Sequence, residues 1–233
     1  MKRNAVVGIG IQSFEKIRER EAFYIDKTGF IREWWEDAAD VTLIMRPRRF
    51  GKTLNLDMLN CFFSNRYANR GDLFEGLSIW EEEKYRELQG TYPVIFLSFA
   101  QIKSGKTEEI KAVLKGIISG CYDNYAYIMD SDIFLKNEKE RFFAVKPSMS
   151  DVTAFSAINT LCGYLERYYG KKPIVLLDEY DTPMQEAWLS GNWEEAVAFF
   201  RSFFNATFKT NPAMYRAVIT GITRISKEAV FSA

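Results

Sequence analysis

Histidine is absent from this chain of 233 residues. A protein without histidine has no Ser-His-Asp triad, no imidazole for proton transfer near neutral pH and no histidine ligand for zinc. Cysteine is scarce, and Cys61, Cys121 and Cys162 stand far apart in the sequence. This spacing matches neither a disulfide framework nor a metal-binding cluster, and it favours buried thiols in a reducing cytoplasm.

The chain also has no excess of positive or negative charge, because 31 Lys and Arg residues balance 31 Asp and Glu residues. A neutral chain has no overall attraction for nucleic acid or for an anionic membrane, so such a partner would need a local patch. The apolar stretch 5–11 is interrupted by two glycines and is too short for a membrane span. We therefore expect no membrane partner and a cytoplasmic location. An apolar content of 47% at this length predicts one core and a single domain.

Short apolar runs alternate with helical patterns along the chain. The first run, 41–45, has no polar alternation, so we expect it to be covered on both faces, as in a parallel sheet between helices. Further strands are predicted at 94–99, 174–177 and 217–220. Helices are predicted at about 14–20, 30–36, 52–63, 80–88, 107–127, 131–144, 151–169 and 193–209. This order predicts an α/β three-layer sandwich with a mainly parallel sheet, right-handed crossovers and a helical insertion between the second and third strands.

The segment 46–53 reads RPRRFGKT and joins the first predicted strand to a helix. Such a turn forms a phosphate cradle, because backbone N–H groups and the positive end of the helix dipole face one anion. We expect Lys52 to bridge the β- and γ-phosphates of a nucleoside triphosphate and the Thr53 hydroxyl to bind Mg²⁺. The predicted nucleotide-binding residues are Arg49, Phe50, Gly51, Lys52, Thr53 and Leu54.

This segment departs from the pattern G-x-x-x-x-G-K-[ST] at its first position, where Arg46 replaces glycine. The replacement leaves the detailed shape of the loop open but keeps the Gly-Lys-Thr end. Arg46, Arg48 and Arg49 either neutralise phosphate charge, contact a partner or are solvated. Three cations in four residues favour an anion contact.

Asp178 and Glu179 follow the apolar run 174–177. In α/β proteins a strand also commonly ends in acidic residues before a capped helix, without any functional site there. Because ligands gather at the carboxyl ends of parallel strands, however, we expect Asp178 to hold Mg²⁺ and Glu179 to orient an attacking water. The segment 182–185 (TPMQ) predicts a capping box that starts the next helix, and Asp181 is interpreted as a residue of that helix start.

The segment 220–224 follows the fourth predicted strand and ends with Arg224. This position makes Arg224 a candidate catalytic residue that senses the γ-phosphate, although a turn followed by a surface arginine explains the same residues nearly as well. The phenylalanines of 193–209 recur at helical spacing, and we interpret them as core rather than as a platform for bases.

Five motifs resemble, in order, those of the AAA-ATPase-like family of prokaryotic P-loop ATPases. They are GIQSFEKIR at 10–18, YIDKT at 24–28, RPRRFGKT at 46–53, LDEYDTP at 177–183 and TGITR at 220–224. The resemblance implies an ATP-binding P-loop NTPase core in which arginine at position 46 is expected. It implies the same roles for Lys52, Thr53, Asp178 and Glu179, and it puts 26–28 near the nucleotide with no assigned role.

Members of this family often carry a nuclease-like PD-(D/E)XK domain after the ATPase, which we do not find in this sequence. Nucleic acid is therefore a partner by family association only. The fold class usually adds a fifth strand beside the phosphate-loop strand, whereas the sequence predicts four. We accordingly expect 41–45 to be an exposed edge, the last core strand to be missing and the single domain 1–233 to be truncated at its C-terminus.

Three functions follow from these patterns. The first is Mg²⁺-dependent ATP hydrolysis, with Lys52, Glu179 and Arg224 as catalytic residues. The second is a nucleotide-gated module that recruits a protein partner or a second copy with little turnover. The third is a small-molecule kinase, which is disfavoured because an acidic pair suits the activation of water better than that of a hydroxyl acceptor.

Overall fold

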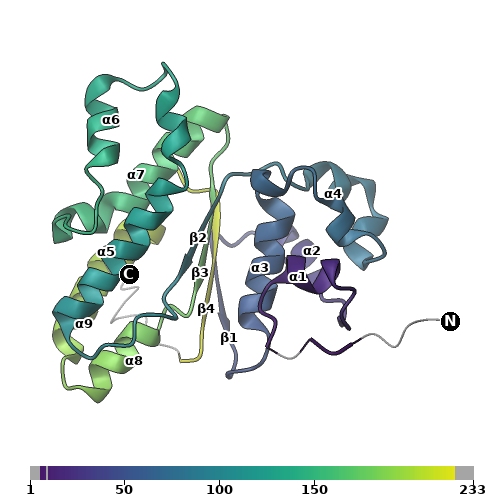
Figure 1. Ribbon diagram of the computed structural model, residues 1–233, viewed down its shortest axis with the longest axis horizontal. Coiled ribbons are helices and arrows are strands. Elements are labelled where there is room, and N and C mark those ends of the chain that lie inside the picture. The colour runs from purple at the N-terminus through teal and green to yellow at the C-terminus, as the bar shows by residue number, and fades with distance from the viewer. Residues whose placement is uncertain (1–5, 9, 224–233) are drawn as a thin grey trace.

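A parallel sheet lies at the centre of the protein, with helices on both faces (Figure 1). This computed structural model describes residues 6–8 and 10–223. Within them the sheet has the strand order β1-β4-β3-β2. Its strands are β1 (Val41–Met45), β2 (Val94–Ser98), β3 (Ile174–Asp178) and β4 (Arg216–Gly221). The predicted α/β fold with a parallel sheet is therefore confirmed.

The register of the sheet brings the carboxyl ends of its strands to one edge. Met45 pairs with Gly221, and Ser98 pairs with Asp178. In parallel α/β sheets this edge is where ligands bind. The segments that follow β1, β3 and β4 include the three site motifs predicted from the sequence.

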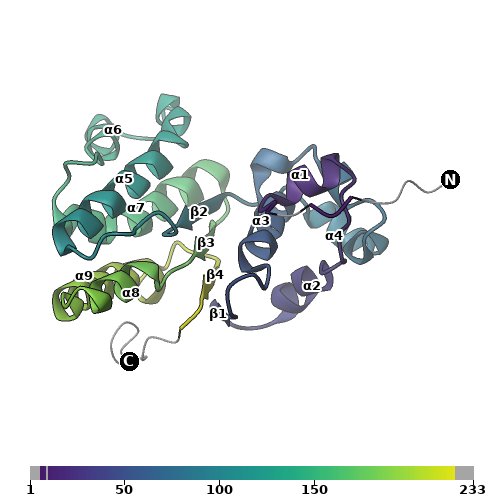
Figure 2. The same ribbon diagram turned by 60° about the horizontal axis from the view of Figure 1, so that its bottom comes forward.

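One face of the sheet is covered by helices from the first part of the chain (Figures 1 and 2). They are α1 (Phe14–Glu19), α2 (Gly29–Glu36), α3 (Lys52–Phe63) and α4 (Glu83–Leu88). Ser13 caps α1, because its hydroxyl accepts a hydrogen bond from the N–H of Lys16. Buried apolar side chains fill this layer, among them Phe14, Ile31, Trp34, Leu59, Phe62, Phe63 and Phe74.

The opposite face carries α5 (Thr107–Asp123), α6 (Lys136–Phe143), α7 (Asp151–Tyr169), α8 (Thr182–Leu189) and α9 (Trp193–Phe204). The first three form the predicted insertion between β2 and β3. Strand β3 contributes side chains to both cores. Ile174 and Leu176 pack in the core under α1 to α4, and Val175 and Leu177 pack in the second core, under α5 to α9. The phenylalanines of α9 are buried in the second core, as predicted. Among the described residues, no helix is both long and apolar enough to cross a membrane.

Some boundaries differ from the sequence predictions. Strand β1 is half-buried along its whole length rather than covered on both faces, because it lies at the edge of the sheet and β4 is its only strand neighbour in the described residues. The helix predicted at 80–88 is divided into the short 3₁₀ turn η3 (Ser78–Glu81) and α4. The helix predicted at 193–209 ends at Phe204 and continues as one wider turn, Asn205–Lys209.

Candidate nucleotide-binding site

The phosphate loop, which we define as residues 46–51, leaves β1 at the carboxyl edge of the sheet and ends where α3 begins. Gly51 has a φ of 75° and Arg49 a φ of 69°, both in the left-handed region. Glycine adopts this conformation without strain, whereas a residue with a Cβ rarely does. Gly51 also has no side chain that would cap α3, so the first N–H groups of the helix face the loop and can bind an anion.

The side chain of Lys52 contacts the backbone of this loop. The side chain is buried, and Nζ donates hydrogen bonds to the carbonyl oxygens of Arg46 at 2.9 Å and Pro47 at 3.0 Å. An ammonium group has three donors, so one donor remains beyond these two bonds. The lysine charge thus lies within the loop that is predicted to receive phosphate.

Thr53 and Asp178 link the two halves of the site. The Thr53 hydroxyl donates a 2.7 Å hydrogen bond to Oδ2 of Asp178 across 125 residues of sequence. Asp178 is only 1% exposed, and its Oδ1 accepts a hydrogen bond from the Thr220 hydroxyl at the end of β4. The structure therefore brings together the phosphate loop, the acidic end of β3 and the end of β4.

The donor set at this point suits Mg²⁺. Magnesium prefers hard oxygen ligands and is commonly held by one or two protein groups together with substrate phosphates. Thr53 and Asp178 offer a hydroxyl and a carboxylate side by side. Over the described ranges, no group of three or more Cys, Asp or Glu side chains is arranged to hold a metal without such phosphates. The residues present thus fit a metal site that is shared with a polyphosphate.

Glu179 has an unusual backbone conformation, with a φ of 53°. A left-handed conformation costs a residue with a Cβ about 1 kcal/mol, and such strain persists mainly where the surrounding structure imposes it. The N–H of Glu179 donates to the Thr220 hydroxyl at 3.4 Å, and its Oε2 accepts from the Thr182 hydroxyl at 3.2 Å. Strain at a carboxylate beside a phosphate loop is consistent with a functional position.

Asp181 does more than begin α8, which is the role predicted for it from the sequence. It is fully buried, and Oδ2 accepts hydrogen bonds from the N–H groups of Ile222 at 2.9 Å and Thr223 at 2.7 Å. The Thr223 hydroxyl and the Gln185 amide each donate to the same oxygen at 2.7 Å. We call this arrangement the Asp181 clamp, because it ties the start of α8 to the segment after β4.

The predicted capping box at 182–185 is wrong. The N-cap of α8 is Asp181, and the Thr182 hydroxyl donates to Glu179 instead of accepting from the helix backbone. The buried carboxylate of Asp181 and the carboxylate of the strained Glu179 both need hydrogen-bond donors. Gln185 and Thr182, which the capping box would have used, supply these donors instead. The sequence signal for this clamp is the third acidic residue in Asp-Glu-x-Asp. Arg224, the candidate sensor, lies outside the described residues.

A cavity of about 500 Å³ opens beside Thr53. It lies between α3, β2 and the N-terminal segment, and its lining includes residues 10–13, Lys16, Arg20 and Ser98. Asp57 on α3 ties this segment down, because Oδ2 accepts a 2.7 Å hydrogen bond from the N–H of Phe14. Burial nevertheless raises the pKa of the Asp57 carboxyl above its ordinary value. The motif at 10–18 therefore lies beside Thr53 and Asp57 of α3.

These features are those of an α/β domain of the P-loop NTPase type. The chain belongs to the AAA-ATPase-like family, described as predicted AAA-ATPase, whose model matches residues 8–231. The family resemblance inferred from the five motifs is thus confirmed. The chain is also 27% identical over 226 residues to a protein of Azotobacter chroococcum mcd 1 named "Uncharacterized protein in vnfD 5'region". That match covers 96% of this chain and 38% of the relative, so the chain spans less than half of the relative's length. No solved structure is significantly similar to the chain.

Proposed function

We propose that this chain binds ATP together with Mg²⁺ and hydrolyses it. The observation that carries the proposal is the 2.7 Å hydrogen bond between Thr53 and Asp178, which joins a phosphate loop to a strand-end carboxylate as a triphosphate site requires. Membership of a family described as predicted AAA-ATPase supports ATP as the nucleotide.

Each residue of the site has a part in this proposal. Lys52 and the N–H groups of 50–53, between Arg49 and Leu54, bind phosphate oxygens and stabilise the charge that develops during transfer. Thr53 and Asp178 hold Mg²⁺, which when bound neutralises charge on the β- and γ-phosphates. The Glu179 carboxylate orients the attacking water and accepts its proton. Arg224 keeps its proposed part as a sensor of the γ-phosphate.

The test is phosphate release by this chain, compared with single substitutions. Glu179→Gln keeps the shape of the side chain but removes the base, so ATP binding is retained and turnover falls by about 100-fold or more. Lys52→Ala weakens ATP binding itself. Glu194→Gln, on an exposed position of α9, is the matched control and releases phosphate at the parent rate. Hydrolysis by Glu179→Gln at the parent rate would show that the assigned base is wrong.

A nucleotide-gated binding module is the second candidate. The observation that favours it is the hydrogen bond from Thr182 to Glu179, because it occupies the carboxylate that would otherwise contact water. In this case ATP binds tightly and no phosphate is released, with or without DNA. The occupied site then acts on a protein partner or a second copy, through the segment that the Asp181 clamp holds. We propose a cytoplasmic location for either function, in keeping with three free, buried cysteines.

A further inference from the structure

We propose that Lys27 is a second cation of the phosphate site, held against the loop by a turn that is fixed to two neighbouring elements. This inference rests on the proposed function, since it needs a phosphate in the loop. A Cβ placed on Gly51 would lie 3.8 Å from Nζ of Lys27. The ammonium group therefore lies next to the residue at which the phosphate loop meets α3.

The residues on both sides of Lys27 are anchored to η3. Oδ1 of Asp26 accepts hydrogen bonds from the N–H of Thr28 at 2.8 Å and from its hydroxyl at 2.6 Å. Oδ2 of Asp26 accepts from the N–H of Ser78 at 2.8 Å. The hydroxyl of Thr28, which is fully buried, also accepts from the N–H of Ile79 at 3.2 Å. These bonds fix the backbone from which the lysine side chain extends.

The Asp26 carboxylate is ionised in this network. Burial alone would raise its pKa, but the hydrogen bonds from Thr28 and Ser78 outweigh burial and hold the pKa of Asp26 below its ordinary value. Both carboxylate oxygens face these donors. The carboxylate adjacent to Lys27 in sequence is therefore engaged in fixing the turn.

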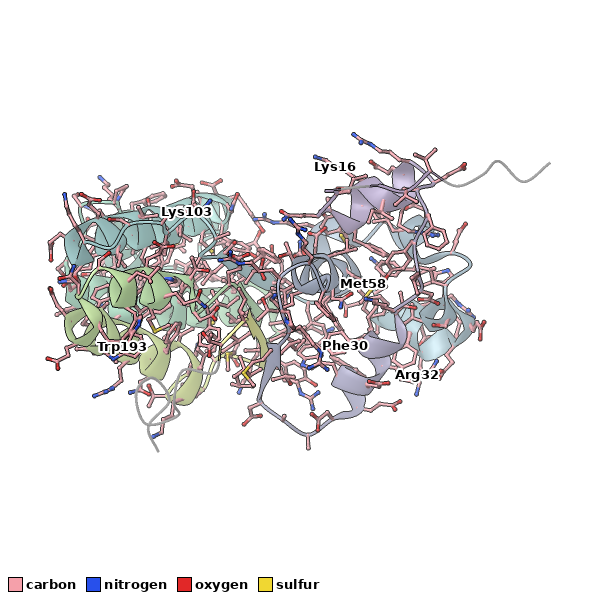
Figure 3. The ribbon with its side chains drawn as sticks, turned by 90° about the horizontal axis from the view of Figure 1, so that it is seen from below. Lys16, Phe30, Arg32, Met58, Lys103 and Trp193 are labelled. Atoms are coloured by element: carbon pink, nitrogen blue, oxygen red, sulfur yellow. The ribbon has the colours of Figure 1, made fainter. Side chains whose placement is uncertain are left out.

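Tyr24 anchors the same turn to α3. Its hydroxyl accepts a hydrogen bond from the N–H of Lys27 at 3.4 Å and donates to Sδ of Met58 at 3.3 Å. Figure 3 shows Met58 and Phe30, which follows this turn in α2, in the same half of the molecule. Because the phosphate loop opens α3, the turn and the loop are fixed to one helix. The backbone of Lys27 thus keeps its place relative to Gly51.

The charge of Lys27 has no partner of its own in the part of the chain that the structure describes, either as a hydrogen bond or as an ion pair of the side chain. Lys52 supplies a second ammonium group to the same loop. Two like charges at one loop repel each other, and a polyphosphate between them removes this repulsion. A cation whose backbone is already ordered also loses less entropy when it binds a ligand.

The experiment is a titration of the parent chain and its variants with ATP and with inorganic tripolyphosphate, which lacks the nucleoside of ATP. Lys27→Met removes the charge, and we expect about tenfold weaker binding of both ligands. Lys27→Arg keeps the charge, and we expect affinities within about twofold of the parent. The control is Lys172→Met, an exposed lysine before β3 at the opposite end of the sheet, whose affinities equal those of the parent.

The outcomes separate this inference from the proposed function. Parent-like affinity of Lys27→Met for both ligands, with binding lost in Lys52→Ala, overturns the role of Lys27 alone. Loss of affinity in Lys27→Arg equal to that in Lys27→Met overturns a role that depends on charge. A folded parent that binds neither ligand overturns the proposed function and this inference together. Thermal unfolding of each variant shows that the fold is kept, as expected for an exposed side chain.

Discussion

The hydroxyl of Thr53 and the carboxylate of Asp178 share a 2.7 Å hydrogen bond, although the two residues lie on different elements and 125 residues apart. Asp178 is buried, and the Thr220 hydroxyl donates to its other oxygen. A buried carboxylate is stable only when donors or a cation compensate for the loss of water. The two threonines therefore keep the carboxylate in place at the edge of the sheet where the phosphate loop ends.

The first prediction concerns the hydroxyl of Thr53. Thr53→Val keeps the shape of the side chain but removes a donor to Asp178, so we expect the free energy of unfolding to fall by about 1–3 kcal/mol. We also expect the dependence of ATP binding on Mg²⁺ to be lost. Chemical denaturation and ATP titrations with and without Mg²⁺ measure the two effects.

Thr53→Ser is the matched control for this substitution, because it retains the hydroxyl. Its Mg²⁺ dependence should equal that of the parent. If Thr53→Val unfolds at the parent denaturant concentration and still binds ATP in a Mg²⁺-dependent way, Thr53 neither supports Asp178 nor contacts the metal.

The second prediction concerns the Asp181 clamp. Asp181→Ala leaves the N–H groups of Ile222 and Thr223 without their acceptor, and we expect a loss of about 2–3 kcal/mol of stability. Because the clamp positions the segment after β4 and not the phosphate loop, turnover should fall more than ATP affinity. Steady-state phosphate release and ATP titration separate these two quantities.

Gln185→Ala is the milder companion of this variant, since it removes one donor to Asp181 and leaves the backbone contacts in place. We expect a smaller loss of stability and turnover close to that of the parent. Equal falls in affinity and turnover in Asp181→Ala would argue that the clamp supports the whole site and not the segment after β4.

Much of the fold was predictable because strands that are covered on both faces consist of continuous apolar runs. This holds for residues 174–177 of β3, a strand that is buried throughout. The meeting of the phosphate loop with the end of β3 was predictable because parallel strands end at one edge of the sheet. For strand β1 two predictions conflicted, because its continuous apolar run indicated cover on both faces whereas the lack of a predicted fifth strand indicated an exposed edge. The edge position is confirmed in the described residues, and it accounts for the half-burial of β1.

The Asp181 clamp and the place of Lys27 could not be predicted in the same way. Asp181 binds a segment 41 and 42 residues further along the chain, and Asp26 binds Ser78 across 52 residues. Such contacts depend on how two loops approach each other after the helices have packed. The acidic pattern and the Asp-Lys-Thr motif mark these residues, but neither pattern identifies their partners.

The third prediction concerns the glycine that ends β4. A Cβ on Gly221 would lie 2.5 Å from Cε1 of Tyr180 and 2.7 Å from Oδ1 of Asp181, which is closer than real Cβ contacts. Gly221→Ala should therefore destabilise the protein by about 1–3 kcal/mol through overpacking. A Cβ on Gly116, within α5, meets no heavy atom within 4 Å beyond its chain neighbours and its own helix backbone, so Gly116→Ala should stabilise by about 0.5–1 kcal/mol. Thermal unfolding of the two variants should shift in opposite directions, and a parent-like melting temperature of Gly221→Ala would contradict the tight packing at this strand end.

The last prediction concerns pH and the turn that carries Lys27. The folded state lowers the pKa of Asp26 from its ordinary value of 3.8, so the carboxylate contributes stability above that pH and loses the contribution as pH falls through the folded-state pKa. The difference in unfolding free energy between the parent and Asp26→Asn should then be constant from about pH 7 to 5 and shrink below about pH 4.

Asp57 is the internal comparison, because burial raises the pKa of its carboxyl. Its contribution to stability is present below its ordinary pKa of 3.8 and is lost as pH rises through the folded-state pKa. The difference between the parent and Asp57→Asn should therefore change in the opposite direction over the acidic range. Denaturant titrations at several pH values measure both slopes, and two differences that change with the same sign would contradict the hydrogen-bonded, ionised state of Asp26.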